Sequence, residues 1–314
     1  MTGDEPIADG GIISFTGPGE KARRLGVVQD GGVLPMPGSA TDVHAERRAM
    51  EALLARLCDA ASAYDLPMAA EPAIPLEKVA VHAPFVPNTI FCSGPNYVSH
   101  LKEMKRRPRD DISRDEASPY FFMKSGLHTV VGTNSVVAPP LETAQLDWEV
   151  ELAVVIGRGG RAIDAAHALD HVAGYSIVID LSARDRFNRE DMPSWKDWLS
   201  AKSFEGAAPF GPAILPARAL RDPQNLELSL SVNAERKQHG NTAEMVFRIA
   251  EQIAYVSQRV ALRPGDVIST GSPAGVGFGS GTFLKSGDRV VARIEGIGSL
   301  SIAIGAPPEP SDRT

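Results

Sequence analysis

The sequence predicts a mainly β protein of the α+β class, with a few flanking helices. Its 314 residues include 29 glycines and 24 prolines, which recur as turns and so favour many short strands over long helices. Apolar runs of strand length follow one another along the chain, whereas helical periodicity is confined to a few segments. A hydrophobic fraction of 43% is enough for a sizeable core, in one large or two modest domains.

Residues 1–80 are predicted to form a small N-terminal α/β domain. We expect strands at "GIISFT", "RRLGVVQ" and "VLPMP", and the segment 42–64 has apolar residues at helical spacing. The Pro-rich stretch at about 65–80 is predicted to be a linker. No residue in this part carries a chemical signature, so we expect it to pack against the rest of the chain or to mediate oligomer contacts.

Residues 81–305 are predicted to form a second, larger domain, and residues 306–314 a disordered tail. Helices are expected from residue 96 to 104, from 164 to 172 and from 242 to 262. The charged run 105–117 is either a solvated loop or a lid over the site. The expected strands are "NTIFCSG", "YFFMK", "HTVVGTNSVVAPP", "QLDWEVELAVVIG", "GYSIVID", "LELSLSVN", "DVIST", "RVVARI" and "SLSIAIG".

Composition narrows the classes of partner and the cellular location. The net charge of −7 argues against a general nucleic-acid or membrane-surface binder, and no apolar stretch approaches the roughly 20 residues that span a bilayer. The N-terminus, "MTGDEPIADGG", lacks the apolar segment of a secretion signal. Cys58 and Cys92 form neither a disulfide framework nor a metal cluster. We therefore expect a cytoplasmic protein.

Two acids interrupt an apolar strand. Glu149 and Glu151 are two residues apart in "QLDWEVELAVVIG", so they project from the same face of the strand. Two buried carboxylates this close require a proton or a cation between them. Asp180 ends the strand "GYSIVID" and is a candidate third ligand. Three carboxylates suit Mg²⁺, Mn²⁺ or Ca²⁺. The alternative, a solvent-facing pair of glutamates, is disfavoured by the unbroken apolar run Leu152–Ile156.

His100 and Glu103 form a second candidate pair. At i and i+3 on a helix they share a face, so Glu103 could orient His100 as a base toward water. The alternative is that His100 and Glu103 are only a surface pair.

His167 and His171 lie at i and i+4 on a predicted helix. They are either a further candidate metal pair or an exposed pair on that helix.

A glycine-dense segment, "STGSPAGVGFGSG", is a candidate ligand loop. It lacks the endings of phosphate-binding and dinucleotide-binding loops. Its backbone N–H groups and the hydroxyls of Thr270 and Ser272 could hold a carboxylate or an oxyanion. Lys124 and Lys202 follow apolar sequence and could neutralise an anionic substrate or extend to the surface.

In this order, six segments resemble the fumarylacetoacetate hydrolase family from about Ile90 to Ile304: "GPNYVSHLKE", "PYFFMKSG", "DWEVELAVVIG", "GYSIVIDLSARD", "AKSFEGAAPFGP" and "LRPGDVISTGSPAGVG". The resemblance implies a mixed β-sandwich roll that is usually dimeric, and hence a homodimer. It also implies a metal triad of Glu149, Glu151 and Asp180, with Mg²⁺ as the expected ion, and a catalytic pair of His100 and Glu103.

The resemblance extends to substrate contacts and to the reaction. It implies that Lys124, Arg184 and the loop with Thr270, Gly271 and Ser272 bind the substrate, and that Lys202 stabilises an oxyanion. The implied reaction is metal-dependent hydrolysis of a C–C bond in an acylpyruvate-like 2,4-dioxo acid, which yields pyruvate and a carboxylic acid. Decarboxylation or keto–enol isomerisation of a 2-oxo dicarboxylate is the first alternative, and an inactive metal- or ligand-binding homologue is the second.

Two positions depart from the family pattern. Phe187 stands where the family usually has a substrate-contacting Gln, so a hydrogen-bonding amide is replaced by apolar area. This change is consistent with a bulkier or more apolar acyl group. Ala234 follows Asn233 where the family often has the Gly of a hairpin turn, and there we expect only structural consequences.

Overall fold

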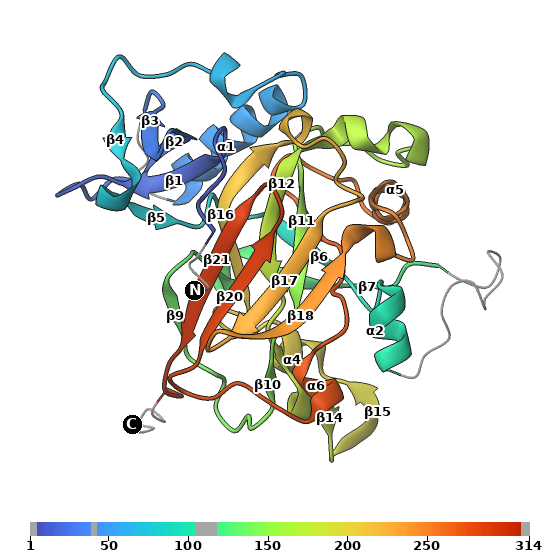
Figure 1. Cartoon of the computed structure of the whole chain (residues 1–314). Coiled ribbons are helices and arrows are strands. Elements are labelled where there is room, and N and C mark those ends of the chain that lie inside the picture. The colour runs from blue at the N-terminus through green and yellow to red at the C-terminus, as the bar shows by residue number, and fades with distance from the viewer. Residues whose placement is uncertain (1–4, 39–42, 105–117, 309–314) are drawn as a thin grey trace.

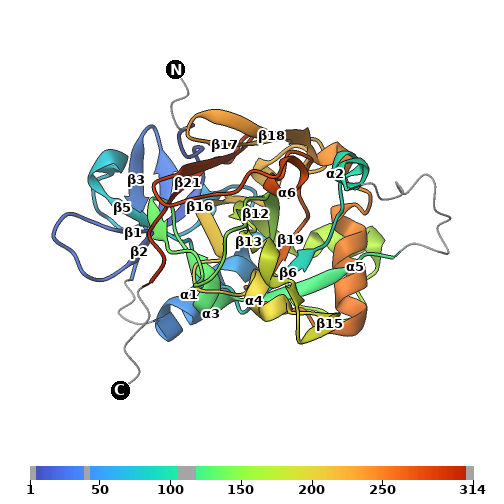
Figure 2. The same cartoon turned by 90° about the horizontal axis from the view of Figure 1, so that it is seen from below.

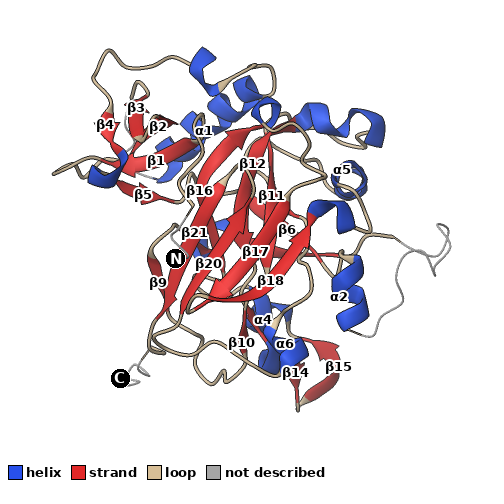
Figure 3. Cartoon of the chain, in the orientation of Figure 1, coloured by secondary structure: helices blue, strands red, loops and turns tan. Residues whose placement is uncertain are grey.

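Strands predominate in the structure, as the sequence predicts (Figure 3). The computed structural model describes residues 5–38, 43–104 and 118–308. Within this part of the chain, no helix is long and apolar enough to cross a membrane.

A twelve-stranded sheet runs through the molecule (Figure 1). Two strands lie off its main path: β5 (Ala80–His82) pairs with β1, and β8 (Val130–Val131) pairs with β16. The main path is β4 (Ile74–Pro75), β3 (Gly32–Pro35), β2 (Arg24–Gln29), β1 (Ile12–Thr16), β16 (Ala208–Pro216), β12 (Val172–Ile179), β11 (Val150–Ile156), β19 (Val267–Ser269), β6 (Thr89–Ser93) and β7 (Phe121–Ser125).

A five-stranded sheet covers one face of β11 and β12 (Figure 1). Leu152 and Val154 of β11 share a buried cluster with this sheet. Ala153 and Val155 instead pack in the cluster that includes Leu54 of helix α1 (Val43–Leu57). Because β11 is covered on both faces, its apolar run needs no polar alternation. The sheet order is β18 (Glu235–Asn241), β17 (Glu227–Val232), β20 (Arg289–Ile294), β21 (Gly298–Ile304) and β9 (Ser135–Val137).

Short elements gather at one end of the two sheets, at the bottom of Figure 1 and facing the viewer in Figure 2. They are α4 (Trp198–Lys202), α6 (Gly277–Ser280), the pair β10 (Leu146–Asp147) and β13 (Ser182–Ala183), and the hairpin β14 (Asn188–Arg189) and β15 (Met192–Lys196). The remaining α-helices are α2 (Val98–Glu103), α3 (Gly126–Thr129) and α5 (Ile249–Arg259). The 3₁₀-helices are η1 (Ala63–Asp65), η2 (Leu76–Lys78), η4 (Ala165–His171), η5 (Arg184–Arg186), η6 (Ala217–Ala219) and η7 (Thr242–Glu244).

Two predicted helices differ from the observed ones. The helix expected over 242–262 is split into η7 and α5, because Asn96 binds two of the backbone N–H groups between them. The N–H of Val246 donates to Asn96 O at 2.7 Å, and that of Phe247 to Asn96 Oδ1 at 2.9 Å. Residues 165–171 form a 3₁₀-helix, whose three-residue turn takes His167 and His171 off a common face.

Strand β16 was not predicted, although it is central to the sheet between β1 and β12. Proline is disfavoured inside a central strand, because it cannot donate to the ladder. In the structure, the register between β12 and β16 shifts between Tyr175 and Ile177, and this irregularity lies opposite Pro212. The sheet thus accepts Pro212 where regular pairing is interrupted, whereas Pro216 pairs with Gly174 at the end of the strand.

The N-terminal residues continue the large sheet through the pairing of Ile12 with Ile214. The segment predicted as a linker carries β4, η2 and β5. A domain boundary near residue 80 stays a prediction, as does the homodimer. The described tail residues 306–308 are exposed, whereas residues 309–314 and the charged run 105–117, with its loop and lid alternatives, lie outside the described residues.

Candidate metal centre and active site

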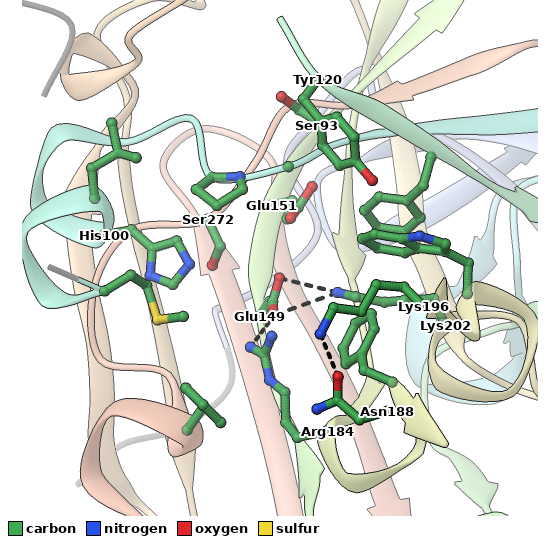
Figure 4. A pocket seen from close by; sticks show the side chains of 18 residues that line it. Ser93, His100, Tyr120, Glu149, Glu151, Arg184, Asn188, Lys196, Lys202 and Ser272 are labelled. Atoms are coloured by element: carbon green, nitrogen blue, oxygen red, sulfur yellow. Dashed lines mark hydrogen bonds and ion pairs between the residues drawn. The ribbon is translucent and has the colours of Figure 1, made fainter. Parts of the chain in front are cut away.

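A cavity of about 580 Å³ opens at the end of the sheets where the short elements gather. This volume is typical of small-molecule sites. Its polar lining includes His100, Glu149, Glu151, Arg184, Lys202 and Ser272, and Figure 4 shows these side chains pointing toward a common space.

Strand pairing brings the three predicted acids together. Glu149 immediately precedes β11, Glu151 lies within it, and Asp180 follows the end of β12. Because Val150 pairs with Ile179 across the antiparallel ladder, Glu149 and Asp180 are neighbours, and the N–H of Asp180 donates to Glu149 O at 2.8 Å. One carboxylate oxygen of each acid lies within 4.8 Å of the others, and all three residues are buried.

The two glutamates have opposite pKa shifts. Burial, together with the charges of Asp180 and Glu149, raises the pKa of Glu151 to about 8. Burial also pushes the pKa of Glu149 upward, but Lys202 and Arg184 outweigh it and hold that pKa at about 2. A neutral and an ionised carboxyl group therefore face one space when no cation is bound.

The donor set fits a divalent cation. Glu151 Oε2 accepts hydrogen bonds from Ser269 Oγ at 2.6 Å and from the N–H of Gly271 at 2.9 Å. Glu151 Oε1 is buried and has no hydrogen-bond partner among the described residues. A buried carboxylate oxygen without a partner is costly, and a hard cation bound by three carboxylates would satisfy it. Glu149, Glu151 and Asp180 are the residues that would hold such an ion.

Both predicted lysines contact Asp180. Lys202 Nζ lies 2.6 Å from Asp180 Oδ2 and 3.4 Å from each carboxylate oxygen of Glu149. Lys124 Nζ lies 2.7 Å from Asp180 Oδ1 and donates to the carbonyl oxygens of Leu181 and Ala207. Burial lowers the pKa of Lys124, against the opposing charge of Asp180. Lys124 is held by two carbonyl oxygens and by its ion pair with Asp180. It is not among the described residues that line the cavity.

The His–Glu pair forms on α2 as predicted from its spacing. His100 Nδ1 lies 2.9 Å from Glu103 Oε2, and Glu103 Oε1 accepts from the N–H of Gly275 at 3.0 Å. His100 is only 5% exposed, so the surface-pair alternative does not hold. Figure 4 shows its imidazole on the side of the cavity opposite Lys202. Because Nδ1 of His100 is paired with Glu103, the other ring nitrogen, Nε2, is available to a molecule in the cavity.

The glycine-dense loop supports the acids. The Thr270 hydroxyl donates to Leu152 O at 2.9 Å. The Ser272 hydroxyl donates to Val150 O at 2.9 Å and accepts from Gln238 Nε2 at 2.8 Å. Of Thr270, Gly271 and Ser272, only Ser272 is among the described residues of the cavity wall. Substrate contact by the other two stays a prediction, and in this structure they orient β11 and Glu151.

Sequence reasoning missed Asp147. This buried carboxylate accepts from Arg184 Nε at 2.8 Å and from the N–H groups of Gly277 and Phe278 at 2.6 and 2.9 Å. The other end of the Arg184 guanidinium bonds to Glu149 Oε1. Asp147 thus fixes the arginine that neutralises Glu149. The available signal was spacing, since Asp147 is two residues before Glu149 and continues the alternation of acids.

Phe187 lies on the cavity wall, at the C-terminal end of η5. Its ring meets that of Trp198 edge-on, with centroids 5.1 Å apart and an interplanar angle of 81°. The position predicted to contact the substrate therefore presents apolar surface.

The fold and the cavity define a β-rich protein with a candidate divalent-metal centre beside a small-molecule cavity. Residues 89–304 match the family model described as fumarylacetoacetate (FAA) hydrolase C-terminal. The chain belongs to the fumarylacetoacetate hydrolase family, as its motifs indicated.

Relatives and solved structures agree with this placement. The human protein named oxaloacetate tautomerase FAHD2A, mitochondrial, is 42% identical over 73% of this chain and 70% of its own length. The fumarylacetoacetate hydrolase of Exiguobacterium antarcticum is 30% identical and superposes with a TM-score of 0.72 over 94% of this chain and 99% of that one. The fumarylpyruvate hydrolase of Pseudomonas aeruginosa, solved with Mn²⁺ and pyruvate, is 30% identical with a TM-score of 0.62 over 72% of this chain and 92% of that one. The cytoplasmic location stays a prediction.

Proposed function

We propose that this chain is a divalent-metal-dependent hydrolase that cleaves a C–C bond of an acylpyruvate-like 2,4-dioxo acid. The observation that carries the proposal is one cavity lined by both the His100–Glu103 pair and two of the three clustered acids. The fumarylpyruvate hydrolase solved with Mn²⁺ and pyruvate supports a 2-oxo acid substrate and a divalent ion. Mg²⁺ is the ion we propose for this chain.

A cation bound by Glu149, Glu151 and Asp180 would supply Lewis-acid polarisation to a 2-oxo acid. Arg184 and Lys202 add positive charge at the floor of the cavity and attract the anionic substrate. His100 Nε2 takes a proton from water, and Glu103 stabilises the resulting imidazolium. The hydroxide adds to the distal carbonyl carbon. The C–C bond then breaks, its electrons stay with the pyruvate fragment, and His100 returns the proton to that carbon.

A second candidate is keto–enol tautomerisation of a 2-oxo dicarboxylate such as oxaloacetate. The relative named as an oxaloacetate tautomerase favours it, and so does the position of Lys202. Its ammonium already contacts Asp180 and Glu149, which leaves it less free to stabilise the oxyanion that hydrolysis requires. Tautomerisation needs only a base and a proton donor beside the bound 2-oxo acid, and His100 serves as both.

Product analysis separates the candidates. The purified protein with Mg²⁺ would be given acylpyruvates and oxaloacetate in parallel. Carboxylic acid and pyruvate in equal amounts from an acylpyruvate support hydrolysis. Faster loss of enol absorbance from oxaloacetate, with neither pyruvate nor CO₂, supports tautomerisation. Release of CO₂ with pyruvate would indicate decarboxylation instead, and ligand binding without turnover would indicate an inactive homologue.

A further inference from the structure

One wall of the cavity is made of aromatic rings that lead outward from Lys202. Lys202 Nζ lies 5.0 Å from the centroid of the Phe122 ring. The Phe122 ring stacks on Trp198 at 5.0 Å and 23°. Trp198 is met edge-on by Phe187 and, at 5.8 Å, by the tilted ring of Tyr120. We name these four residues, Tyr120, Phe122, Phe187 and Trp198, the aromatic wall, and all four line the cavity.

The aromatic wall is held in place by its own packing. Its rings come from Tyr120 just before β7, from Phe122 within β7, from the residue after η5 and from α4. The other three rings all contact Trp198. A Cβ on Gly94 would lie 2.7 Å from Tyr120 Cδ1, so the Tyr120 ring rests directly against this backbone. A ligand group that docks here meets a preformed flat surface and orders few side chains, which lowers the entropic cost of binding.

We propose that the aromatic wall selects the acyl group of the substrate, and that this group is aromatic. The inference rests on the proposed function, because it places the polar head of a 2,4-dioxo acid at the carboxylates, Arg184 and Lys202. The acyl end then extends along the apolar surface that Phe122, Trp198 and Phe187 present to the cavity. A flat ring can make offset or edge contacts with this surface.

Other acyl groups suit this wall less well. An acetyl group would leave much of the wall in water. A tail that ends in a carboxylate would lose hydration against the rings. Lys196 lines the cavity near them, but its ammonium is hydrogen-bonded to Asn188 Oδ1. An aryl acyl group is the chemistry that uses the whole wall.

Turnover tests this selection with the full chain in the presence of Mg²⁺. We expect kcat/KM for benzoylpyruvate to exceed that for acetylpyruvate and for fumarylpyruvate by at least about tenfold, the low end of what one well-fitted apolar group contributes. Phe187→Ala is expected to lower the benzoyl-to-acetyl ratio by about tenfold, and Phe187→Leu by less. The control is Trp195→Ala, since Trp195 is 70% exposed and is not among the described cavity residues; the ratio should not change.

Two results would overturn the inference. One is that acetylpyruvate is turned over as well as or better than benzoylpyruvate. The other is a preference for fumarylpyruvate, which would indicate that Lys196 binds a carboxylate at the end of the acyl group. Failure of the proposed function is a separate outcome. If no acylpyruvate is cleaved, calorimetry with Mg²⁺ still compares the affinities of benzoylpyruvate and acetylpyruvate. An affinity at least about tenfold higher for benzoylpyruvate upholds the aromatic wall, and equal affinities refute it.

Discussion

Glu149 and Glu151 lie two residues apart on one strand, yet their environments separate their pKa values. Glu149 faces Arg184 and Lys202 and stays ionised, whereas Glu151 accepts hydrogen bonds from Ser269 and Gly271, which do not offset its burial. With a pKa of about 8, Glu151 holds a proton at neutral pH when no metal is bound. A metal ion must displace that proton to bind.

We therefore predict that Mg²⁺ affinity depends on pH. Below pH 8 each bound ion releases about one proton from Glu151, so affinity should rise about tenfold per pH unit from pH 6 to 8 and level off above it. Titration calorimetry at several pH values, in buffers of different ionisation enthalpy, measures both affinity and proton release. An affinity that is flat below pH 8 would remove Glu151 from the centre, and Glu151→Gln should abolish both the slope and most of the binding.

His100 is predicted to be the base that the reaction needs. His100→Ala should lower kcat/KM by about 10²–10⁴-fold, the usual contribution of a general base. Mg²⁺ affinity should stay within a fewfold, because His100 is not one of the clustered acids. The matched control is His128→Ala, since His128 is exposed on α3. A loss of less than about tenfold would assign the proton transfer to another group.

At the scale of elements, Gly279 of α6 leaves the space that the Glu103 side chain occupies beside His100. A Cβ on Gly279 would lie 2.6 Å from Glu103 Oε1, and the long Glu103 side chain can move away without disturbing the backbone. Gly279→Ala is thus predicted to turn Glu103 away from His100 and to lower kcat by at least about tenfold, since small misplacements of catalytic groups are costly. Activity and thermal unfolding measured together check this.

Its control is Gly32→Ala, where a new Cβ would meet atoms only at ordinary distances of 3.4 Å or more. That variant should keep its activity. Unchanged kcat in Gly279→Ala would show that the orientation of Glu103 does not limit catalysis, and an unfolded variant would show that the loop cannot accommodate the change.

The hairpin between β17 and β18 stores backbone strain. Its two turn residues, Asn233 and Ala234, have φ angles of 50° and 67°, the left-handed region that costs an L-residue such as alanine roughly 1–2 kcal/mol. Ala234→Gly should relieve this strain and raise the free energy of unfolding by about 1 kcal/mol, after the entropy that glycine adds to the unfolded chain. Chemical denaturation measures it. Ala219→Gly, on η6 without a positive φ, should be neutral or destabilising; a gain there as large as at residue 234 would contradict the strain argument.

The elements of the site differ in how far the sequence predicts them. Local patterns, namely the alternation of Glu149 and Glu151 and the strand end at Asp180, predicted that the three acids lie together. The structure places them in one cluster. The position of Lys124 is not local, because it depends on carbonyl groups of Leu181 and Ala207 that lie far along the chain. Strand β16 escaped prediction for a related reason: Pro212 lies where the register between β12 and β16 is irregular, which depends on a strand far along the chain.

At the scale of the whole molecule, the N-terminal residues and the catalytic part share one sheet and one core. β1 joins β16 through Ile12 and Ile214, and α1 buries Leu54 in the same cluster as Ala153 and Val155 of β11. The strand that carries Glu151 is therefore supported on one face by residues from the first 80. If there is a boundary near residue 80, we therefore expect the residues on its two sides to unfold together and not as separate units.

This continuity predicts that a destabilising substitution in β1 also lowers the stability of the catalytic part of the chain. Ile12 is fully buried in the shared cluster, so Ile12→Ala should lower the free energy of unfolding by about 2–5 kcal/mol, and Ile12→Val, as the matched control, by only about 0.5–1.5 kcal/mol. The tryptophans, Trp148, Trp195 and Trp198, all lie in the catalytic part. If the molecule unfolds as one unit, the denaturation midpoint measured by tryptophan fluorescence must fall with Ile12→Ala, because the lost packing is subtracted from the stability of the whole chain. A tryptophan transition that does not move, while the helical signal acquires an earlier step, would show that residues 1–80 unfold independently.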